Sequence, residues 1–386
     1  MGDFNASRRH VMLAASALAM ASAAARAQPR NDRAKAGKAD AAAKALFAAN
    51  PTPALSLAVA RPTGVIWAQA YGKADLEYDL PATPAHRFKL GSVSKVLTST
   101  TAARMAVRGQ VDLDAPISNW LKDLPAAHRQ TTLKQLLTHR GGVRHYMPRD
   151  MDLAAPGGAL DFRVYPTNKE ILAAFINDPL IGPVGGQVAY STFGYTLASL
   201  VLEAAAGQPF PALVKAEIGA PFGLTSLDAD DPQSLRPMRV TGYGPASDYR
   251  RAGYPLVADG WANARQTNPA YKWAGGGFIM TPSDIARFGA ALIDSPSSKV
   301  TAAERALLFT PLTQATKQMP PLGLAWRIDA DAKGRRRWHH AGAQEGGRAS
   351  LVIYPDVGLS IAFATNVATV PTNVLTPSSD LADAFS

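Results

Sequence analysis

Ser92 and Lys95 are the residues in this chain whose types and spacing best fit nucleophilic chemistry. A serine hydroxyl is a weak nucleophile at neutral pH and needs a nearby base to take its proton; a desolvated lysine amine can be that base. Side chains three positions apart lie on one face of a helix, so a helix beginning here would bring the Lys95 amine to the Ser92 hydroxyl. The pair therefore indicates covalent catalysis by a serine nucleophile.

The residues on either side of this pair predict the element that would position it. Residues 88–91 read as an extended approach and a turn, and residues 96–107 contain no Pro or Gly. Gly109 then predicts the end of a helix. Ser92 would lie in the first turn, where free backbone N–H groups and the helix dipole favour a developing oxyanion. The same spacing also occurs by chance roughly once or twice in a chain of this length, and then Ser92 is a helix N-cap and Lys95 a solvated side chain.

Two further elements carry groups suited to the same chemistry. Tyr190 follows a glycine-rich stretch at 182–186 and precedes a predicted helix that begins at Phe193. A tyrosine phenolate can serve as the base for a serine. His340 lies in a predicted strand, and Gly342 in that strand would let another backbone or a substrate approach closely.

The order of these three elements resembles the serine β-lactamase and penicillin-binding superfamily, whose motifs are S-x-x-K, Y-x-N and [KH]-[ST]-G. The text between the motifs is similar to the class C branch, and it looks closest to the mitochondrial serine β-lactamase-like proteins and their bacterial relatives. The resemblance covers residues 45–367, and motif order with spacing makes it specific. The segments that carry it are 87–95, 136–139, 190–195, 221–225 and 271–278.

This resemblance implies a role for each motif residue. Ser92 would be the acylated nucleophile, and Lys95 and Tyr190 the pair that transfers its proton. The backbone N–H groups of Ser92 and Ala343 would form the oxyanion hole. His340 would take the place of the third-motif Lys or His and help to hold the Tyr190 proton network and the substrate. Acylation and deacylation by such a set need no metal and no cofactor.

Two residues depart from the superfamily pattern at positions expected to bind substrate. Thr192 stands where the superfamily usually has Asn, and it lacks the amide that contacts a substrate acylamide. Ala341, next to Gly342, stands where the family has Ser or Thr and removes a hydroxyl that normally faces the substrate. Both changes point away from β-lactam hydrolysis and towards another amide or an ester.

The rest of the chain predicts a mixed α/β (α+β) fold of the β-lactamase/transpeptidase-like kind. Strands at both ends of the sequence with helices between them imply an antiparallel sheet, flanked by helices and carrying an inserted helical region. The cleft between two such parts is a usual place for a site. The expected strands are 55–60, 65–71, 338–340, 349–354 and 359–364. The expected helices are 96–107, 132–138, 169–176, 193–205 and 282–292.

The N-terminus reads as a targeting segment. Residues 1–27 hold Arg8 and Arg9 before an apolar stretch, and they end in a small-x-small cleavage form, which predicts a signal peptide and a periplasmic product. The paired arginines have the form of a twin-arginine signal, but an ordinary secretory signal with two basic residues fits them too, so the export route stays open. We expect a linker or frayed helix at 28–44, one hydrolase domain at 45–370 and a tail at 371–386. No later apolar stretch is long enough to span a bilayer.

Composition excludes several other classes of protein. The chain of 386 residues has no Cys, which excludes disulfides, thiolate catalysis and Cys-ligated zinc. The formal net charge is +10, yet the densest basic cluster, 333–337, reads as a solvated hairpin turn and no nucleic-acid motif accompanies it. His139 and His145 suggest a metal pair at first sight, but no Asp or Glu stands at ligand spacing, so structural histidines are the better interpretation.

Two functions remain open at this point. The first is an exported serine hydrolase that acts through an acyl-enzyme on a peptide, D-amino-acid peptide, ester or β-lactam. The second is a catalytically weak penicillin-binding or scaffold protein of the same fold. An α/β-hydrolase is a weaker interpretation, because the segment 91–95 is not a G-x-S-x-G elbow and ends in Lys95 where that motif has Gly. Specificity would reside in the segments 147–165 and 242–273, and nothing in the sequence specifies an oligomeric state.

Overall fold

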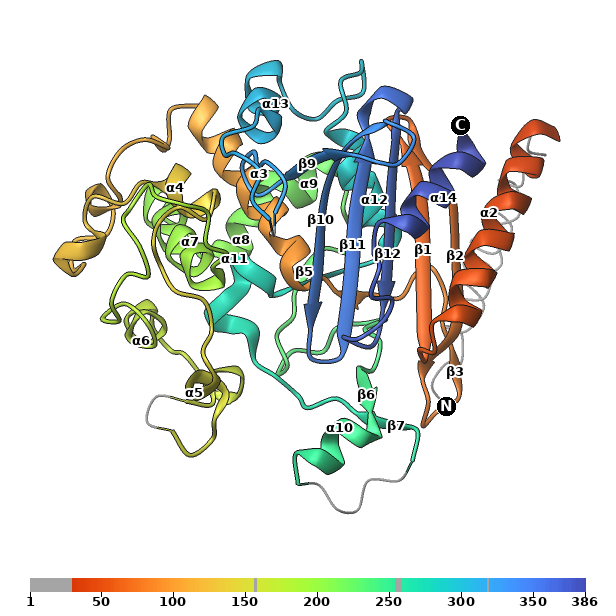
Figure 1. The fold of residues 1–386 in the computed structure, drawn as a ribbon, viewed down its shortest axis with the longest axis horizontal. Coiled ribbons are helices and arrows are strands. Elements are labelled where there is room, and N and C mark those ends of the chain that lie inside the picture. The colour runs from red at the N-terminus through yellow and green to blue at the C-terminus, as the bar shows by residue number, and fades with distance from the viewer. Residues whose placement is uncertain (1–29, 156–157, 254–258, 318) are drawn as a thin grey trace, which may run out of the picture.

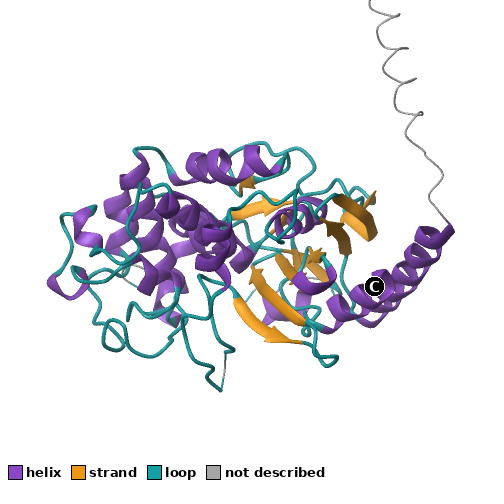
Figure 2. Ribbon diagram, turned by 90° about the horizontal axis from the view of Figure 1, so that it is seen from above, coloured by secondary structure: helices purple, strands orange, loops and turns teal. Residues whose placement is uncertain are grey.

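The chain folds into a β-sheet with a helical region beside it, as Figures 1 and 2 show. This computed structural model describes residues 30–155, 158–253, 259–317 and 319–386. The expected mixed fold, with an antiparallel sheet built from both ends of the chain, is confirmed. The expected signal segment, residues 1–27, lies outside the described residues.

The main sheet joins strands that are far apart in the sequence. Its seven strands follow the order β3-β2-β1-β12-β11-β10-β9, and each neighbouring pair is antiparallel. Ala58 of β1 stands opposite Ala362 of β12, so the first and last long strands are central neighbours. The strands are β1 (Ala54–Arg61), β2 (Gly64–Asp75), β3 (Leu80–Pro81), β9 (Arg327–Ala330), β10 (Arg336–Gln344), β11 (Gly347–Tyr354) and β12 (Leu359–Thr365).

Both faces of the central strands are buried, by different partners. Alternate residues of a strand point to opposite faces. Ala54 and Ala58 therefore face the main core that the sheet shares with the helical region, whereas Leu55 and Leu57 face a second core on the outer side. The small inner residues let α12 (Pro282–Ala291) approach the sheet closely.

Two terminal helices cover the outer face. Of the two alternatives expected at 28–44, a linker or a frayed helix, the structure has the helix from residue 30 onward and not the linker. Residues Arg30–Ala49 form one helix, α2, which lies beside α14 (Thr376–Phe385) within the segment expected to be a tail (Figure 1). Ala39 and Ala43 are fully buried in the outer core with Leu381 of α14. The alanine-rich composition that suggested a linker is also the strongest helix-forming composition, and packing against α14 decides between the two.

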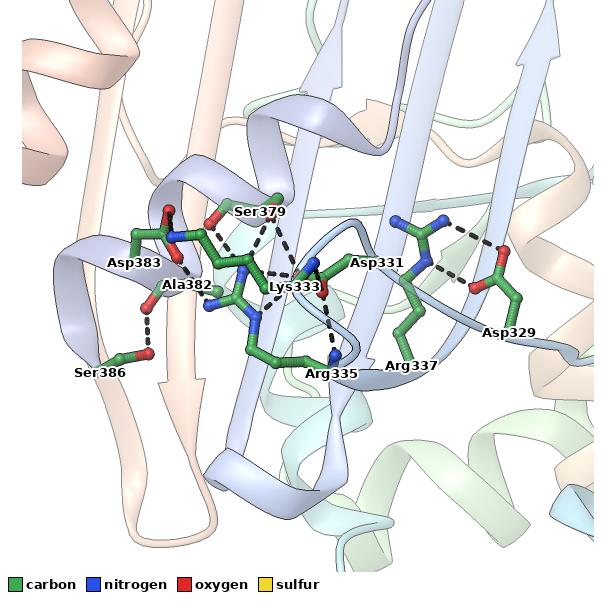
Figure 3. A network of polar contacts seen from close by, with 9 residues as sticks. All are labelled: Asp329, Asp331, Lys333, Arg335, Arg337, Ser379, Ala382, Asp383 and Ser386. Atoms are coloured by element: carbon green, nitrogen blue, oxygen red, sulfur yellow. Dashed lines mark hydrogen bonds and ion pairs between the residues drawn. The ribbon is translucent and has the colours of Figure 1, made fainter.

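The turn between β9 and β10 is tied to α14 by ion pairs (Figure 3). Arg335 donates to Asp331 and Asp383, both at 2.7 Å, and Lys333 donates to Asp383 at 2.6 Å. Arg335 also donates to the Ser379 hydroxyl at 2.8 Å. The basic cluster is therefore a hairpin turn, as expected, and these two cations are paired with carboxylates.

The helical region lies on the inner side of the sheet. The expected helices are all present within a few residues of their predicted ends, so those predictions are confirmed. Two smaller sheets, β4-β8-β5 and β6-β7, connect this region to the main sheet. Its helices and those beside it are α3 (Ser94–Val107), α4 (Leu133–Leu137), α5 (Pro148–Met151), α6 (Asn168–Ala173), α7 (Thr192–Ala206), α8 (Phe210–Val214), α9 (Ala220–Phe222), α10 (Ala246–Arg251), α11 (Trp273–Gly276) and α13 (Ala302–Phe309). The short strands are β4 (Phe88–Lys89), β5 (Asp228–Ala229), β6 (Tyr243–Pro245), β7 (Trp261–Asn263) and β8 (Phe278–Met280).

In the described part of the chain, no single helix is long and apolar enough to cross a bilayer. One bent pair, Thr192–Ala206 with Phe210–Phe222, meets the length and composition requirement across a 76° bend.

Candidate active site

Ser92 and Lys95 meet at the start of α3. Ser92 lies in a short 3-10 turn, Gly91–Val93, that continues directly into the helix, and Lys95 lies in the first helical turn. Lys95 Nζ stands 3.2 Å from Ser92 Oγ. Ser92 is half-buried and Lys95 is completely buried. The spacing of three residues thus places the amine beneath the hydroxyl, as the sequence predicts for a helix.

The surroundings of the Lys95 amine come from two separate segments besides its own helix. It donates to the Gly275 carbonyl of α11 at 2.6 Å and to the Thr192 hydroxyl of α7 at 3.2 Å. Burial lowers the pKa of Lys95, although the nearby Tyr190 works in the opposite direction. A buried amine with a lowered pKa gives up its proton more readily than a solvated lysine does.

Tyr190 completes a group of three around the Ser92 hydroxyl. Its phenol donates to Ser92 Oγ at 2.7 Å, and Lys95 Nζ lies 4.9 Å from the centre of its ring. Burial alone would raise the pKa of Tyr190, but the charge of Lys95 and the hydrogen bonds with Ser92 and Lys95 outweigh it and lower the pKa. Lys95 and Tyr190 therefore titrate as a coupled pair.

The β10 strand brings a second backbone against the Ser92 turn. A Cβ atom added to Gly342 would lie 2.4 Å from the Ser92 nitrogen and 2.2 Å from the Leu90 oxygen. One added to Gly91 would lie 2.7 Å from the Ala343 nitrogen. Only glycine at both positions allows this approach, which places the amides of Ser92 and Ala343 close together. Two backbone N–H groups that lie close together suit a developing oxyanion.

His340 lies buried beneath the same site. Its Nδ1 donates to the carbonyl of the half-buried Ala341 at 2.8 Å, which assigns the ring proton to Nδ1 and leaves Nε2 as an acceptor. Burial, reinforced by the positive charges of Arg327 and Lys95, holds the pKa of His340 well below its usual range. The third motif therefore contributes a neutral imidazole to this site.

Thr192 is held in place by its neighbours in the site. It is the first residue of α7, and its hydroxyl accepts the hydrogen bond from Lys95. A Cβ atom added to Gly275 would lie 2.4 Å from Thr192 Cγ2 and 3.4 Å from Lys95 Nζ. Gly275 is thus required wherever Thr192 and Lys95 occupy these positions.

Several residues of the site escape sequence reasoning. Gly275 supplies the acceptor for Lys95, and His139 and His145 lie beside Tyr190. Arg327 begins β9 opposite His339 of β10, and its charge adds to the stronger effects that lower the pKa values of Lys95 and Tyr190. These residues follow no short motif, because they approach the site only through the tertiary fold. Within the described residues, no group of three or more His, Cys, Asp or Glu side chains is placed to hold a metal.

Comparisons with known proteins relate this chain to one family. A family model described as Beta-lactamase covers residues 39–382. The human mitochondrial serine beta-lactamase-like protein LACTB is 24% identical over 292 residues, which are 59% of this chain and 51% of the human protein. The chain therefore spans about half the length of the mitochondrial relatives it matches.

Two further comparisons extend the likeness to other proteins. Esterase EstB of Burkholderia gladioli is 29% identical over 175 residues, which are 43% of this chain and 44% of the esterase. The structure of D-amino acid amidase from Ochrobactrum anthropi SV3 superposes with a TM-score of 0.75 at 21% identity. That superposition covers 92% of this chain and 98% of the amidase, and it shows a shared fold.

Proposed function

The chain belongs to the Beta-lactamase family, and we propose that it is a serine hydrolase that cleaves an amide or an ester through an acyl-enzyme on Ser92. The observation that carries this proposal is the convergence of Lys95 and Tyr190 on one hydroxyl, at 3.2 Å and 2.7 Å. A scaffold of the same fold has no need for a buried amine with a lowered pKa at that position.

In the proposed acylation, the Ser92 proton moves to the Lys95–Tyr190 pair while Ser92 Oγ attacks the substrate carbonyl. The phenol oxygen lies nearer to Ser92 Oγ than the amine does, so once ionised it is the group that accepts the proton, and the lysine charge stabilises that ionised form. The N–H groups of Ser92 and Ala343 stabilise the oxyanion of the tetrahedral intermediate. The pair then gives its proton to the leaving amine or alkoxide as the carbon–heteroatom bond breaks.

Deacylation repeats these steps with water as the nucleophile. The Lys95–Tyr190 pair takes a proton from the water, the water oxygen attacks the ester of Ser92, and the pair returns the proton to Ser92 Oγ. His340 takes no proton in this scheme. Its neutral ring lies beneath the pair, with Nε2 unprotonated, and supplies an acceptor without adding a charge.

We infer that the substrate is a peptide, a D-amino-acid peptide or an ester rather than a β-lactam. The Thr192 hydroxyl accepts a hydrogen bond from Lys95, and threonine has no side-chain amide that could bind a substrate acylamide. Ala341 offers no hydroxyl at the edge of β10, and His340 is neutral, so the third motif has neither of the groups that would bind an anionic substrate there. The esterase and amidase likenesses are consistent with this class.

We also propose that the protein is exported and acts in the periplasm. This proposal rests on the sequence of residues 1–27, with Arg8 and Arg9 before the apolar stretch. The small-molecule or peptide substrates proposed above are compatible with a location outside the cytoplasm.

Covalent labelling tests the acyl-enzyme directly. A fluorophosphonate probe should add one label per chain, on the peptide that contains Ser92, and Ser92→Ala should lose both label and turnover while keeping its melting temperature. Ser99→Ala is the matched control, because that hydroxyl lies on the same helix and only donates to the Val96 carbonyl. Wild type that neither reacts with the probe nor hydrolyses esters, amides or β-lactams would establish the scaffold alternative instead.

A further inference from the structure

Two histidines form hydrogen bonds with the backbone next to Tyr190. His139 Nδ1 accepts the N–H of Ser191 at 3.1 Å, and His145 Nδ1 accepts the N–H of Thr192 at 3.3 Å. These are the two amides that immediately follow Tyr190. The main-chain carbonyl of His139 also accepts the N–H of Ala189 at 2.8 Å, so His139 binds the backbone before and after Tyr190.

The same two rings pack against the phenol ring. The His139 and Tyr190 ring centres are 4.4 Å apart with the planes tilted by 34°, and the His145 ring meets Tyr190 edge-on with centres 5.4 Å apart. The Ser191 hydroxyl adds a further tie by donating to the Arg144 carbonyl at 2.8 Å. Segment 139–145 therefore contacts Tyr190 in two ways, through the backbone on both sides of Tyr190 and through the Tyr190 ring.

His139 adopts a backbone conformation that is costly for its residue type. Its φ is +58°, in the left-handed region that glycine occupies most readily. It is the second residue after α4, where a glycine is the usual helix terminator. Histidine is less stable than glycine in this backbone conformation, so its presence here is consistent with a requirement for its ring.

From these contacts we propose that His139 and His145 are positioning residues that hold Tyr190 on Ser92 as neutral hydrogen-bond acceptors. The inference rests on the proposed serine hydrolase function and names what aligns its proton-transfer group. Both rings must carry their proton on Nε2, because Nδ1 faces a backbone donor in each case. Neither Nδ1 is then free to bind a metal.

The charges around the two rings favour this neutral form. Burial and nearby cations hold the pKa of His139 well below its usual range and lower the pKa of His145 to about 4. A proton on Nδ1 would place an N–H group opposite the backbone N–H group, so the hydrogen bond between them would be lost. The charged or titratable groups around His139 are Lys95, Arg327, His145, His340, Tyr190 and Tyr195, and the charges of Lys95 and Arg327 disfavour its protonation. Those that face His145 are Lys95, Lys272, Arg144 and Asp150, of which only Asp150 favours protonation.

Matched substitutions separate positioning from simple stability. Asn places its amide oxygen near the position of His Nδ1, whereas Ala offers no acceptor. His139→Ala and His145→Ala should each lower kcat for an ester by ~10²-fold with KM nearly unchanged, since a misplaced catalytic group costs about that much. His139→Asn and His145→Asn should recover most of the loss. The control is His86→Ala: the buried His86 Nδ1 also accepts a backbone N–H, that of Thr83 at 3.0 Å, but in a turn before β4.

A spectroscopic measurement tests the same proposal without activity. Nitrogen-15 NMR of the histidine rings at neutral pH should show His139 and His145 as neutral Nε2–H tautomers. A protonated ring or an Nδ1–H tautomer would overturn the proposal, as would Asn variants no better than Ala or an equal kcat loss in His86→Ala. Turnover that survives Ser92→Ala refutes the acyl-enzyme instead. If His139→Ala fails to fold, the His145 variants and the wild-type tautomers still decide the matter.

Discussion

The phenol oxygen of Tyr190 donates a hydrogen bond to Ser92 Oγ at 2.7 Å, closer than the Lys95 amine at 3.2 Å. The shortest hydrogen bond of that amine goes instead to the Gly275 carbonyl, at 2.6 Å. The tyrosine is thus the group best placed to exchange a proton with the nucleophile. The lysine is best placed to stabilise the phenolate by its charge.

Replacing the Tyr190 phenol tests whether Tyr190 is the group that exchanges a proton with Ser92. Tyr190→Phe keeps the ring packing against His139 and removes only the oxygen, so we expect kcat/KM to fall by ~10²–10⁴-fold with little change in melting temperature. Tyr165→Phe is the control, since that phenol only donates to the Leu160 carbonyl at 2.9 Å. A Tyr190→Phe variant within about threefold of wild type would remove Tyr190 from the mechanism.

The pH dependence of turnover should report the Lys95–Tyr190 pair. The pKa values of both groups are lowered from their ordinary values, and the base must be deprotonated to act. kcat/KM should therefore rise with pH and level off at a lower pH than a free lysine or tyrosine would require. The apparent pKa belongs to the pair, so Tyr190→Phe should move it. A profile that rises only above about pH 10 would contradict this assignment.

Position 192 should govern the choice between substrates. Thr192→Asn supplies the amide that this site lacks, and its side-chain oxygen can still accept a hydrogen bond from Lys95. We expect β-lactam turnover to rise relative to ester turnover, measured with chromogenic substrates of both kinds on one preparation. Ser191→Ala serves as the control, because it changes the neighbouring N-cap without adding an amide. Equal changes in both activities would show that position 192 does not set the substrate class.

The sequence predicts the site residues that are close together along the chain, and it does not predict most of those that the tertiary fold brings in. Ser92 and Lys95 are three residues apart, so helix geometry alone brings them together. Tyr190 and His340 enter through motif order, which the family resemblance supplies. His145, Arg327 and the other residues that tune them come from distant loops and strands. No local pattern marks such residues, because each is close to Ser92 only after the chain folds.

In the fold, too, elements with a local pattern were predictable, and an element that depends on a distant partner was not. The strands of the sheet alternate or run apolar between clear turn signals, and their antiparallel pairing follows from their order. Residues 28–44 have no such pattern, since alanine, lysine and aspartate suit both a linker and an exposed helix. The partner that decides is α14, whose own residues lie more than 300 positions later. Its packing could not be foreseen from the composition of either segment.

Export should depend on the arginine pair near the N-terminus. Changing Arg8→Lys and Arg9→Lys together keeps the positive charge but removes the guanidinium pair, so we expect the precursor to accumulate in the cytoplasm. Cell fractionation with mass spectrometry of the product measures this, and the mature chain should begin at Gln28. Arg26→Lys is the control, because it alters an arginine of the same segment outside the pair. Unchanged export of the double variant would leave the general secretory route.

Acid should destabilise the fold well before its carboxylates are protonated. Burial is the main cause that lowers the pKa of each of the six histidines in the described part of the chain: His86, His128, His139, His145, His339 and His340. In the unfolded chain these rings take up protons below about pH 6.5, whereas the folded state keeps them neutral. The unfolded state then binds more protons, so stability is fully present above that pH and is lost as pH falls.

Each ring that stays neutral in the folded state costs up to about 1.4 kcal/mol of unfolding free energy per pH unit below that point. His139 and His340 are the most deeply buried of the site, so we expect a loss of about 2 kcal/mol or more between about pH 7 and about pH 5. The paired carboxylates of Asp329 and Asp331, with pKa values lowered to about 2, contribute their loss only at lower pH. Urea unfolding across this range measures the difference. A free energy of unfolding that stays flat from about pH 7 to about pH 5 would mean that these rings accept protons within the folded protein.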